Sequence, residues 1–263
     1  GIAGMEDVLG KVQVKDQVIG GAWLLNGNGG AVQADAITGD FQVTATGEFG
    51  GVKTKGDAVG TFIADYVGSL SVGGDASFTI TAEGLKDLKV KQNLTDTVIT
   101  LGGAFDASIK ALGKLDVKGV IDMLTLDSVN SLGKLGATAI MDSRIFAGIG
   151  ALDAQQPLPT EGGDFANMAK IDGVTIKGKK DGSADYERTN IAAWELGKVK
   201  LSVVEGDNAY QPFGVGASII GGIDGEMLGG EKFKFSKLDD PQLFQDELAD
   251  AGVDLDDFRI ELV

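Results

Sequence analysis

Carboxylate and basic side chains that could support catalysis gather in two short stretches of the chain. The first places Asp142 beside Arg144, and the second lies within residues 178–190. Its charged candidates are Lys180, Asp181, Asp185, Glu187 and Arg188. Glycosidases use two carboxylates about 5–10 Å apart across a groove, whereas polysaccharide lyases of the β-helix type use Ca²⁺ with a basic residue. Because an aspartate at a turn more often bonds the backbone beside it, we predict no catalytic residues and keep a polysaccharide-active enzyme as the alternative.

Composition removes several other kinds of chemistry. The 263 residues include no His and no Cys, so there is no imidazole base, disulfide framework or thiolate metal site. We therefore expect no cofactor and no bound metal. Lys and Arg number 23 against 39 Asp and Glu, a net charge of −16. This balance argues against nucleic acid and anionic membrane surfaces as partners. No apolar run is long enough for a transmembrane helix, so we expect no membrane insertion.

The elements that must position these residues look like strands. All four prolines lie at or after Pro157, and a proline-free stretch rich in Val, Ile and Thr suits continuous sheet. Short alternating runs such as Ser77-Phe78-Thr79-Ile80-Thr81 are bounded by Gly, Asp or Asn, as strands are. The 41 glycines, about 16% of the chain, supply turns between such strands.

A glycine, a lysine and an apolar residue recur together, as in Gly113-Lys114-Leu115 and Gly133-Lys134-Leu135. The apolar anchors of this motif and its near relatives are residues 12, 32, 52, 70, 88, 115, 135, 171 and 199. Five of the eight intervals are 18 to 20 residues long, and the interval of 36 before Ile171 equals two coils of 18. A second strand follows each anchor after about ten residues, with Phe62, Ile80, Ile99, Leu124 and Ile145 as the candidates.

This period predicts an all-β fold, a right-handed parallel β-helix (β-solenoid) with coils of about 20 residues. The alternative is a β-sandwich of antiparallel hairpins, whose strands also recur every 8 to 12 residues. Repetition of the motif itself, and the scarcity of Asn-Gly hairpin turns, favour the solenoid. We assign residues 1–236 to one solenoid domain, with regular coils over about 10–150 and looser coils with inserted loops over 151–236.

The repeats at 68–75, 86–94 and 113–119 resemble the G-x-L-x-V-x-G-D repeats of bacterial secreted and surface parallel β-solenoid proteins, of the autotransporter-like and planctomycete-type exoprotein kinds. Residues 141–148 look like the second strand of such a repeat. The resemblance covers roughly residues 10–150 and implies a secreted or cell-surface location in a bacterium. Residues 221–225 are faintly similar to calcium-binding nonapeptide repeats but lack their tandem arrays, so we predict no calcium site.

Three excursions interrupt the second half, at 151–168, 178–190 and 205–213. Insertions in a repeat array often emerge on a binding face, and Tyr and Arg are typical of contact surfaces. We therefore predict ligand-binding residues at Tyr186, Arg188 and Tyr210. The competing interpretation is that an aromatic residue pins each long loop to the core.

Residues 237–263 are predicted to form an acidic C-terminal cap. Asp239 or Asp240 can begin a helix with Pro241 at its first position, and Gly252 can end it. The apolar face of this helix would be Leu243, Phe244, Leu248 and Val253, and the last six residues alternate like an edge strand. Residues 239–263 hold nine acids and one base, half of the net charge.

We therefore expect an exported structural or adhesive β-solenoid module that is non-catalytic and binds through loops of its second half. The expected partner is carbohydrate or another surface protein, and the alternative is a polysaccharide-active enzyme (lyase or glycoside hydrolase) or carbohydrate-binding β-helix. Ice binding would need a ladder of Thr-x-Thr motifs. The sequence offers only Thr44-Ala45-Thr46 and Thr79-Ile80-Thr81, and we predict no ladder.

Overall fold

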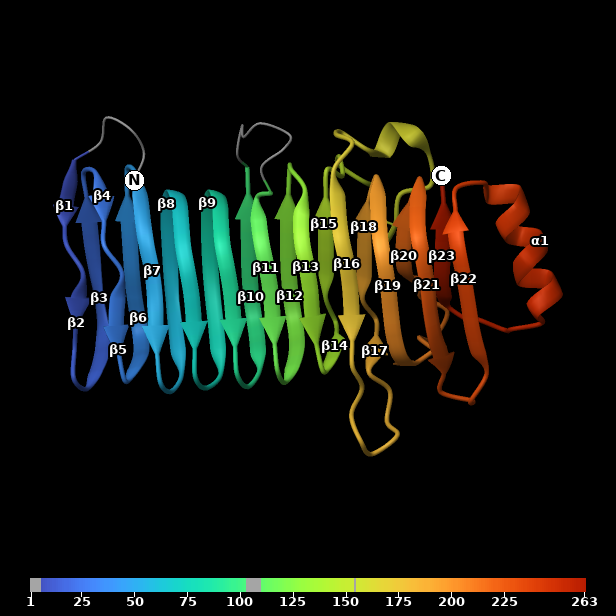
Figure 1. Ribbon diagram of the computed structural model, residues 1–263, viewed down its shortest axis with the longest axis horizontal. Helices are drawn as coiled ribbons and strands as arrows, with labels where there is room; N and C mark the ends of the chain where they lie inside the picture. Colours follow the sequence, from blue (N-terminus) through green and yellow to red (C-terminus); the bar gives the residue numbers. More distant parts are fainter. Residues whose placement is uncertain (1–5, 103–109, 154) are drawn as a thin grey trace.

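The chain forms an elongated parallel β-solenoid, as predicted (Figure 1). The computed structural model describes residues 6–102, 110–153 and 155–263. Every ladder between named strands is parallel except the one that joins β21 to β22. Parallel pairing of consecutive strands rules out the β-sandwich, because a sandwich is built from antiparallel hairpins.

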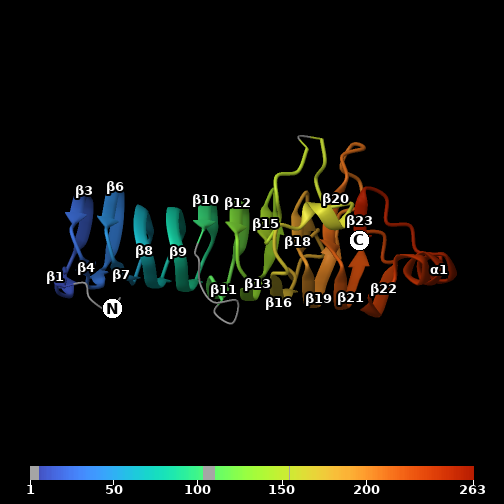
Figure 2. The same cartoon turned by 90° about the horizontal axis from the view of Figure 1, so that it is seen from above.

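Each coil is flattened, so the strands lie in two rows that we call sheet one and sheet two (Figure 2). The strands β8 (Ala58–Val72) and β9 (Ala76–Val90) bend near their middle and contribute to both. Sheet one also contains β3 (Gln17–Leu25), β6 (Ala36–Ala45), β10 (Leu94–Leu101), β12 (Val120–Ser128), β14 (Ala139–Met141), β15 (Arg144–Ala147), β17 (Tyr186–Glu187), β18 (Asn190–Ala193), β20 (Phe213–Ala217) and β23 (Phe258–Leu262). Sheet two contains β1 (Asp7–Leu9), β2 (Val12–Gln13), β4 (Asn28–Gly29), β5 (Val32–Ala34), β7 (Glu48–Thr54), β11 (Leu112–Val117), β13 (Leu132–Ala137), β16 (Lys170–Ile176), β19 (Glu195–Val204), β21 (Ile219–Met227) and β22 (Lys232–Leu238).

The predicted apolar anchors stack into one column of the core. The register of sheet two aligns Val12, Val32, Val52, Leu70, Leu88, Leu115, Leu135, Val174, Val199 and Ile223. From Val32 onward each of these side chains is buried. Alternation along a strand sends such residues inward, and the coil spacing of about 4.8 Å puts them in contact.

Two predicted positions are wrong in register. Leu135 pairs with Val174, so Ile171 lies three residues before the true anchor. The interval of 36 is therefore not two coils but a single coil lengthened by inserted loops. In sheet one, Ile99 pairs with Leu126 rather than with Leu124. Met123, just after β12 begins, has φ of +54°, and this kink shifts the inward positions that follow it.

The C-terminal segment caps the solenoid (Figure 1). The helix α1 (Pro241–Ala251) begins where the Asp240 carboxylate accepts hydrogen bonds from two backbone N–H groups, and ends at Gly252 with φ of +63°. Phe244 is buried and meets Phe235 of β22 edge-on, with ring centroids 5.3 Å apart. Leu243, predicted to lie on the apolar face, is instead exposed. No described helix is long and apolar enough to cross a membrane.

Candidate functional site

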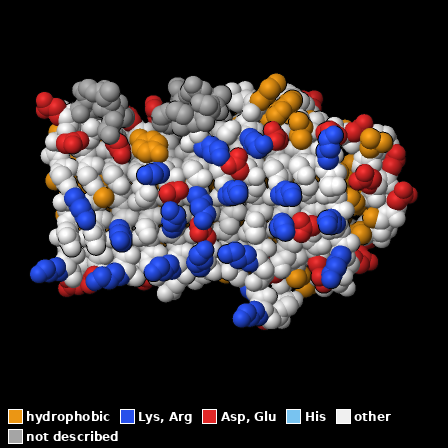
Figure 3. Space-filling view, viewed as in Figure 1, with side chains coloured by type: hydrophobic (Ala, Val, Ile, Leu, Met, Phe, Trp, Pro, Cys, Tyr) orange, Lys and Arg blue, Asp and Glu red, His pale blue; other side chains and the backbone are white. Residues whose placement is uncertain are grey.

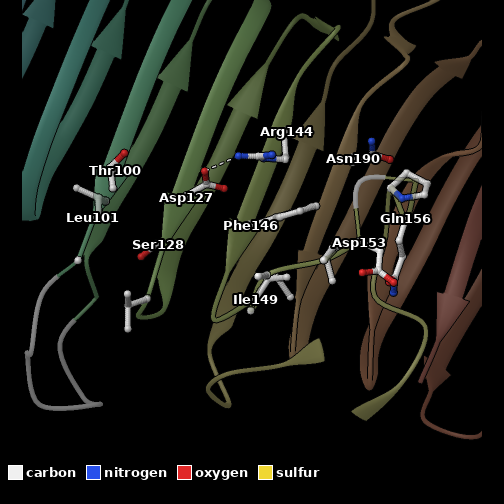
Figure 4. Close-up of a pocket in the computed structure, with 16 residues that line it drawn as sticks. Thr100, Leu101, Asp127, Ser128, Arg144, Phe146, Ile149, Asp153, Gln156 and Asn190 are labelled. Atoms are coloured by element: carbon white, nitrogen blue, oxygen red, sulfur yellow. Dashed lines mark hydrogen bonds and ion pairs between the residues drawn. The ribbon is translucent and has the colours of Figure 1, made fainter. Parts of the chain in front are cut away.

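A groove with a volume of about 570 Å³ lies on the outer face of sheet one. Its floor comes from β10, β12, β15 and β18, and one wall comes from the chain that leaves β15 (Figure 4). Its lining residues are Thr100, Leu101, Gly102, Asp127, Ser128, Val129, Arg144, Phe146, Ile149, Gly150, Ala151, Leu152, Asp153, Gln156, Pro157 and Asn190. The first of the predicted excursions therefore builds a concave site.

Arg144 is the central charged group of the floor. Its guanidinium Nη2 lies 2.6 Å from Oδ2 of Asp127, and its Cζ lies 5.5 Å from the centre of the Phe146 ring. The side chains of Arg144 and Asp127 are 49% and 40% exposed, so both can reach a ligand. Two strands one coil apart hold this pair, since Thr125 of β12 is in register with Arg144. The ion pair and the cation–π contact fix the guanidinium on a rigid floor.

The groove also offers neutral polar groups. Asn190 follows Arg144 in the same register row, and Gln156 and Asp153 come from the wall. Carboxylate, amide and guanidinium groups together supply donors and acceptors in several directions. Phe146 is buried beneath Arg144, so it does not present a free stacking face. The site therefore suits a hydroxyl-rich polar ligand bound mainly by hydrogen bonds.

Asp164 holds the wall in shape. Its Oδ2 accepts hydrogen bonds from the backbone N–H of Thr160 at 2.8 Å, from that of Glu161 at 3.2 Å, and from Nε2 of Gln156 at 2.7 Å. Its carbonyl oxygen accepts from the N–H of Gly150 at 2.7 Å. The backbone hydrogen bond from Thr160, with those from Glu161 and Gln156, outweighs burial and lowers the pKa of Asp164.

Rows of hydroxyl side chains run from the groove toward the N-terminal end. Sheet one aligns Gln42, Thr61, Thr79, Val98 and Thr125 in one row and Thr44, Ile63, Thr81, Thr100 and Asp127 in the next. The described strands form no ladder of Thr-x-Thr motifs, because only Thr79-Ile80-Thr81 places a threonine in both rows. Each coil contributes one or two members, and only the register brings single threonines from different coils together.

The predicted binding residue Tyr186 belongs to the core. Its side chain has no exposed surface, and its hydroxyl oxygen lies 2.8 Å from the carbonyl oxygen of Thr189 and 3.0 Å from that of Gly214. Its ring stacks on Phe213, with centroids 6.1 Å apart. Burial raises the pKa of the phenol well above its ordinary value. The residue pins its loop to the core, which was the competing interpretation.

Arg188 is partly exposed and forms a two-point ion pair with Asp142, with Nε–Oδ1 at 2.6 Å and Nη2–Oδ2 at 2.7 Å. The hydrogen bonds from Arg188 lower the pKa of Asp142 and in turn raise the pKa of Arg188. Arg144 therefore pairs with Asp127, not with its sequence neighbour Asp142.

Tyr210 is 92% exposed on the excursion between β19 and β20, which rises from the same side of the solenoid as the chain that leaves β15 (Figure 2). The structure does not place Tyr186, Arg188 and Tyr210 in one pocket: none of them lines the groove.

Two of the remaining acidic candidates, Asp185 and Asp181, accept hydrogen bonds from nearby backbone N–H groups. Asp185 is buried and accepts from the N–H of Lys179 at 2.7 Å and of Val203 at 3.3 Å. Asp181 accepts from the N–H and hydroxyl of Ser183. No cluster of three metal-ligating acids occurs in the described ranges.

Sequence reasoning missed the groove residues Asp127, Asn190 and Gln156. Their only signal is their register with Arg144 or their place in the first excursion.

Comparisons with known proteins add no information about the site, so its chemistry is inferred from its geometry. No family model, no curated protein and no solved structure matches this chain.

Proposed function

We propose that this protein is an exported, non-catalytic adhesive β-solenoid module of a bacterial cell surface, and that it binds carbohydrate in the groove over sheet one. The observation that carries the proposal is the exposed Arg144–Asp127 pair on a rigid floor beside a polar wall. The bacterial surface location is supported only by the resemblance of the repeats described above.

A sugar chain fits the chemistry of this site. Hydroxyl groups both donate and accept, so they can pair with Asp127, Arg144, Asn190 and Gln156 in turn. The flat, hydroxyl-bearing rows that lead away from the groove offer room for further sugar units. Asp127, Arg144 and Asn190 sit on strands, which hold them in place before the ligand arrives and so lower the entropy cost of binding.

The test is a glycan array followed by calorimetry with the strongest glycan. Arg144→Ala should weaken binding about tenfold or more, which corresponds to about 1.4 kcal/mol. Arg259→Ala is the matched control, because Arg259 lies in the same register row of sheet one but outside the groove. Equal binding by the wild type and Arg144→Ala would overturn the proposal, as would the absence of any bound glycan.

The enzyme alternative has its own measurement. Asp127 and Asp153 both line the groove, so a reducing-sugar assay on acidic and neutral polysaccharides should accompany the array. The proposal expects no product release. Turnover by the wild type that Asp127→Asn or Asp153→Asn abolishes would replace the adhesive module with a polysaccharide-active enzyme.

Ice binding is a second candidate, favoured by the hydroxyl and apolar rows of sheet one. The threonines of these rows, together with the exposed side chains of Ile63 and Val98, could order water along the coils. Measurement of thermal hysteresis tests it, and Thr79→Lys with Thr81→Lys should abolish any hysteresis found while leaving the groove intact.

A further inference from the structure

The outer face of sheet two carries most of the basic side chains that the strands contain. From β7 to β22 its strands hold eleven lysines against seven acids, a surplus of four positive charges. The strands of sheet one, within the described residues, hold only Arg144 and Arg259 as basic residues. Figure 3 shows the lysines spread along this face. Since the whole chain carries −16, the remainder carries −20, and the two faces differ sharply in charge.

The register places several lysines side by side. Lys114 pairs directly with Lys134 on the next coil, and Lys198 precedes Lys200 by two positions on β19, which puts both on one face. Like charges that face each other across a ladder are destabilising. Some lysines of this face are neutralised by neighbours, as where Lys114 and Lys118 both contact Asp116 at 2.9 Å and 2.8 Å. Others have no ion-pair partner among the residues that the structure describes.

A hollow of about 200 Å³ lies among three of the unneutralised lysines. Gly221 and Gly222 of β21 have no side chains, and this leaves a recess between β19 and β22. Its rim holds Lys198, Lys200 and Lys234 with a single acid, Asp224. None of the three lysines forms an ion pair with a carboxylate of the described residues. The hydroxyl of Ser236 completes the lining.

We propose that the outer face of sheet two binds an anionic polysaccharide, with one acidic group of the chain in the hollow between Lys198, Lys200 and Lys234. A bound carboxylate or sulfate would offset the repulsion between neighbouring lysines. Removal of this repulsion favours the complex over the free protein. This surface is separate from the groove and goes beyond the proposed function, because it gives the rod a second contact on its opposite side.

Charge density decides between an acidic sugar chain and nucleic acid. Duplex DNA carries one charge per about 1.7 Å of axis, and the −20 of the remaining residues would repel it strongly. The described strands of this face pair side by side in one sheet, and none of them projects from it to enter a groove and read base edges. A sugar chain with one acidic group per unit is less densely charged and can lie along rows of lysines about 4.8 Å apart.

The experiment compares the full chain with two triple variants on immobilised polygalacturonate, dextran sulfate and neutral dextran at several salt concentrations. Lys198→Glu with Lys200→Glu and Lys234→Glu should weaken binding to the acidic polymers by about tenfold or more and flatten its salt dependence. The control, Lys15→Glu with Lys179→Glu and Lys180→Glu, makes the same change in net charge at residues outside the strands and away from the hollow. It should bind nearly as the wild type does.

Equal loss in both triple variants would overturn the proposal, because binding would then follow net charge alone. Failure of the wild type to bind either acidic polymer, or tighter binding to duplex DNA, would also overturn it. Circular dichroism and the midpoint of thermal unfolding show whether each variant is folded, and Lys198→Gln with Lys200→Gln serves as a milder replacement if the triple variant is not. Arg144→Ala should keep polyanion binding, which separates this surface from the groove.

Discussion

Three buried hydroxyls explain how the solenoid tolerates a kink in the strands of sheet one. Asp96, Asp142 and Arg188 have φ of +45°, +49° and +40°, a region that side-chain-bearing residues seldom adopt. The residue after each of them is a buried Thr97, Ser143 or Thr189. Each hydroxyl donates to the carbonyl two residues earlier, at 3.0, 2.6 and 2.8 Å respectively. Each also accepts an N–H from the preceding coil, so that N–H stays hydrogen-bonded at the kink.

Ser143→Ala should therefore lower the free energy of unfolding by about 1–3 kcal/mol, because the N–H of Leu124 loses its buried acceptor. Ser143→Thr should stay close to the wild type, since threonine does the same work at positions 97 and 189. Urea unfolding followed by circular dichroism measures both. An alanine variant as stable as the threonine variant would contradict this account of the kink.

The wall of the groove depends on the charge of one carboxylate, Asp164. Its pKa lies below the ordinary value of 3.8, so its contribution to the order of the wall is complete above that value. The contribution is lost as the pH falls through the lowered pKa, because protonation removes acceptors. We expect the protection factors of the Thr160 and Glu161 amides, each taken relative to the intrinsic exchange rate at the same pH, to be high near neutral pH and to fall as the pH drops through the lowered pKa.

Asp164→Asn should lower the protection factors of these two amides at neutral pH and should remove the pH dependence of their protection. Hydrogen exchange followed by mass spectrometry of this peptide measures it. Slow exchange in the Asn variant would show that the wall is held by contacts other than the carboxylate.

At the scale of the element, the glycine of the Gly-Lys-apolar motif is required by close approach of neighbouring coils. A Cβ on Gly133 would lie 1.8 Å from the carbonyl oxygen of Gly113, and one on Gly113 would lie 2.4 Å from that of Lys86. Gly197 has the same relation to Asp172, at 2.0 Å. Neighbouring backbone fills the space that a side chain would need, so the coil spacing itself selects glycine here.

Gly133→Ala should accordingly destabilise the solenoid by about 1–3 kcal/mol through overpacking against backbone. Gly229→Ala is the matched control, because no atom lies within 4 Å of its Cβ position. The difference between their thermal unfolding midpoints is the measurement. Equal midpoints would mean that adjacent coils separate at little cost.

At the scale of the whole molecule, the two ends of the described solenoid differ in how they are covered. At the C-terminal end α1 covers the last coil, and β23 completes sheet one beside β20. At the N-terminal end of the described chain, β3 pairs only with β6 and exposes Ile19 and Leu24. Acidic residues crowd the capped end, where their mutual repulsion opposes stacking of another chain.

Deleting residues 239–263 should cause end-to-end association. The deletion removes α1 and β23, exposes Phe213 and Phe235, leaves the edge of β20 unpaired and takes the helix away from β22. Light scattering at matched concentrations compares the truncated and full chains, and circular dichroism verifies that the strands persist. A truncated chain that keeps the molecular mass of the full chain would contradict this role of the cap.

The repeating core could be predicted from the sequence because each coil is specified by residues close together in the chain. Each coil carries its own glycine, its own alternation and its own apolar anchor, so a period near 20 residues indicates stacked parallel strands wherever it occurs. The helix cap was readable for the same reason, since Asp240, Pro241 and Gly252 act within one helix. The predicted register of an apolar residue was wrong at only two positions. At Ile171 long insertions had changed the spacing between coils, and at Leu124 a kink had shifted the alternation of inward and outward side chains.

The groove, the lysine hollow and the fate of the predicted site residues were decided by the tertiary structure. Asp127 and Arg144, which form an ion pair, are 17 residues apart in the sequence, and the paired Asp142 and Arg188 are 46 residues apart. The number of residues in each coil, including any insertion, therefore decides which charged side chains become neighbours. Tyr186 reads like a loop residue, yet its register with Ile140 carries it into the core. The sequence determined that the chain coils, and the stacking of the coils, which aligns distant residues every 4.8 Å or so, determined which side chains share a surface.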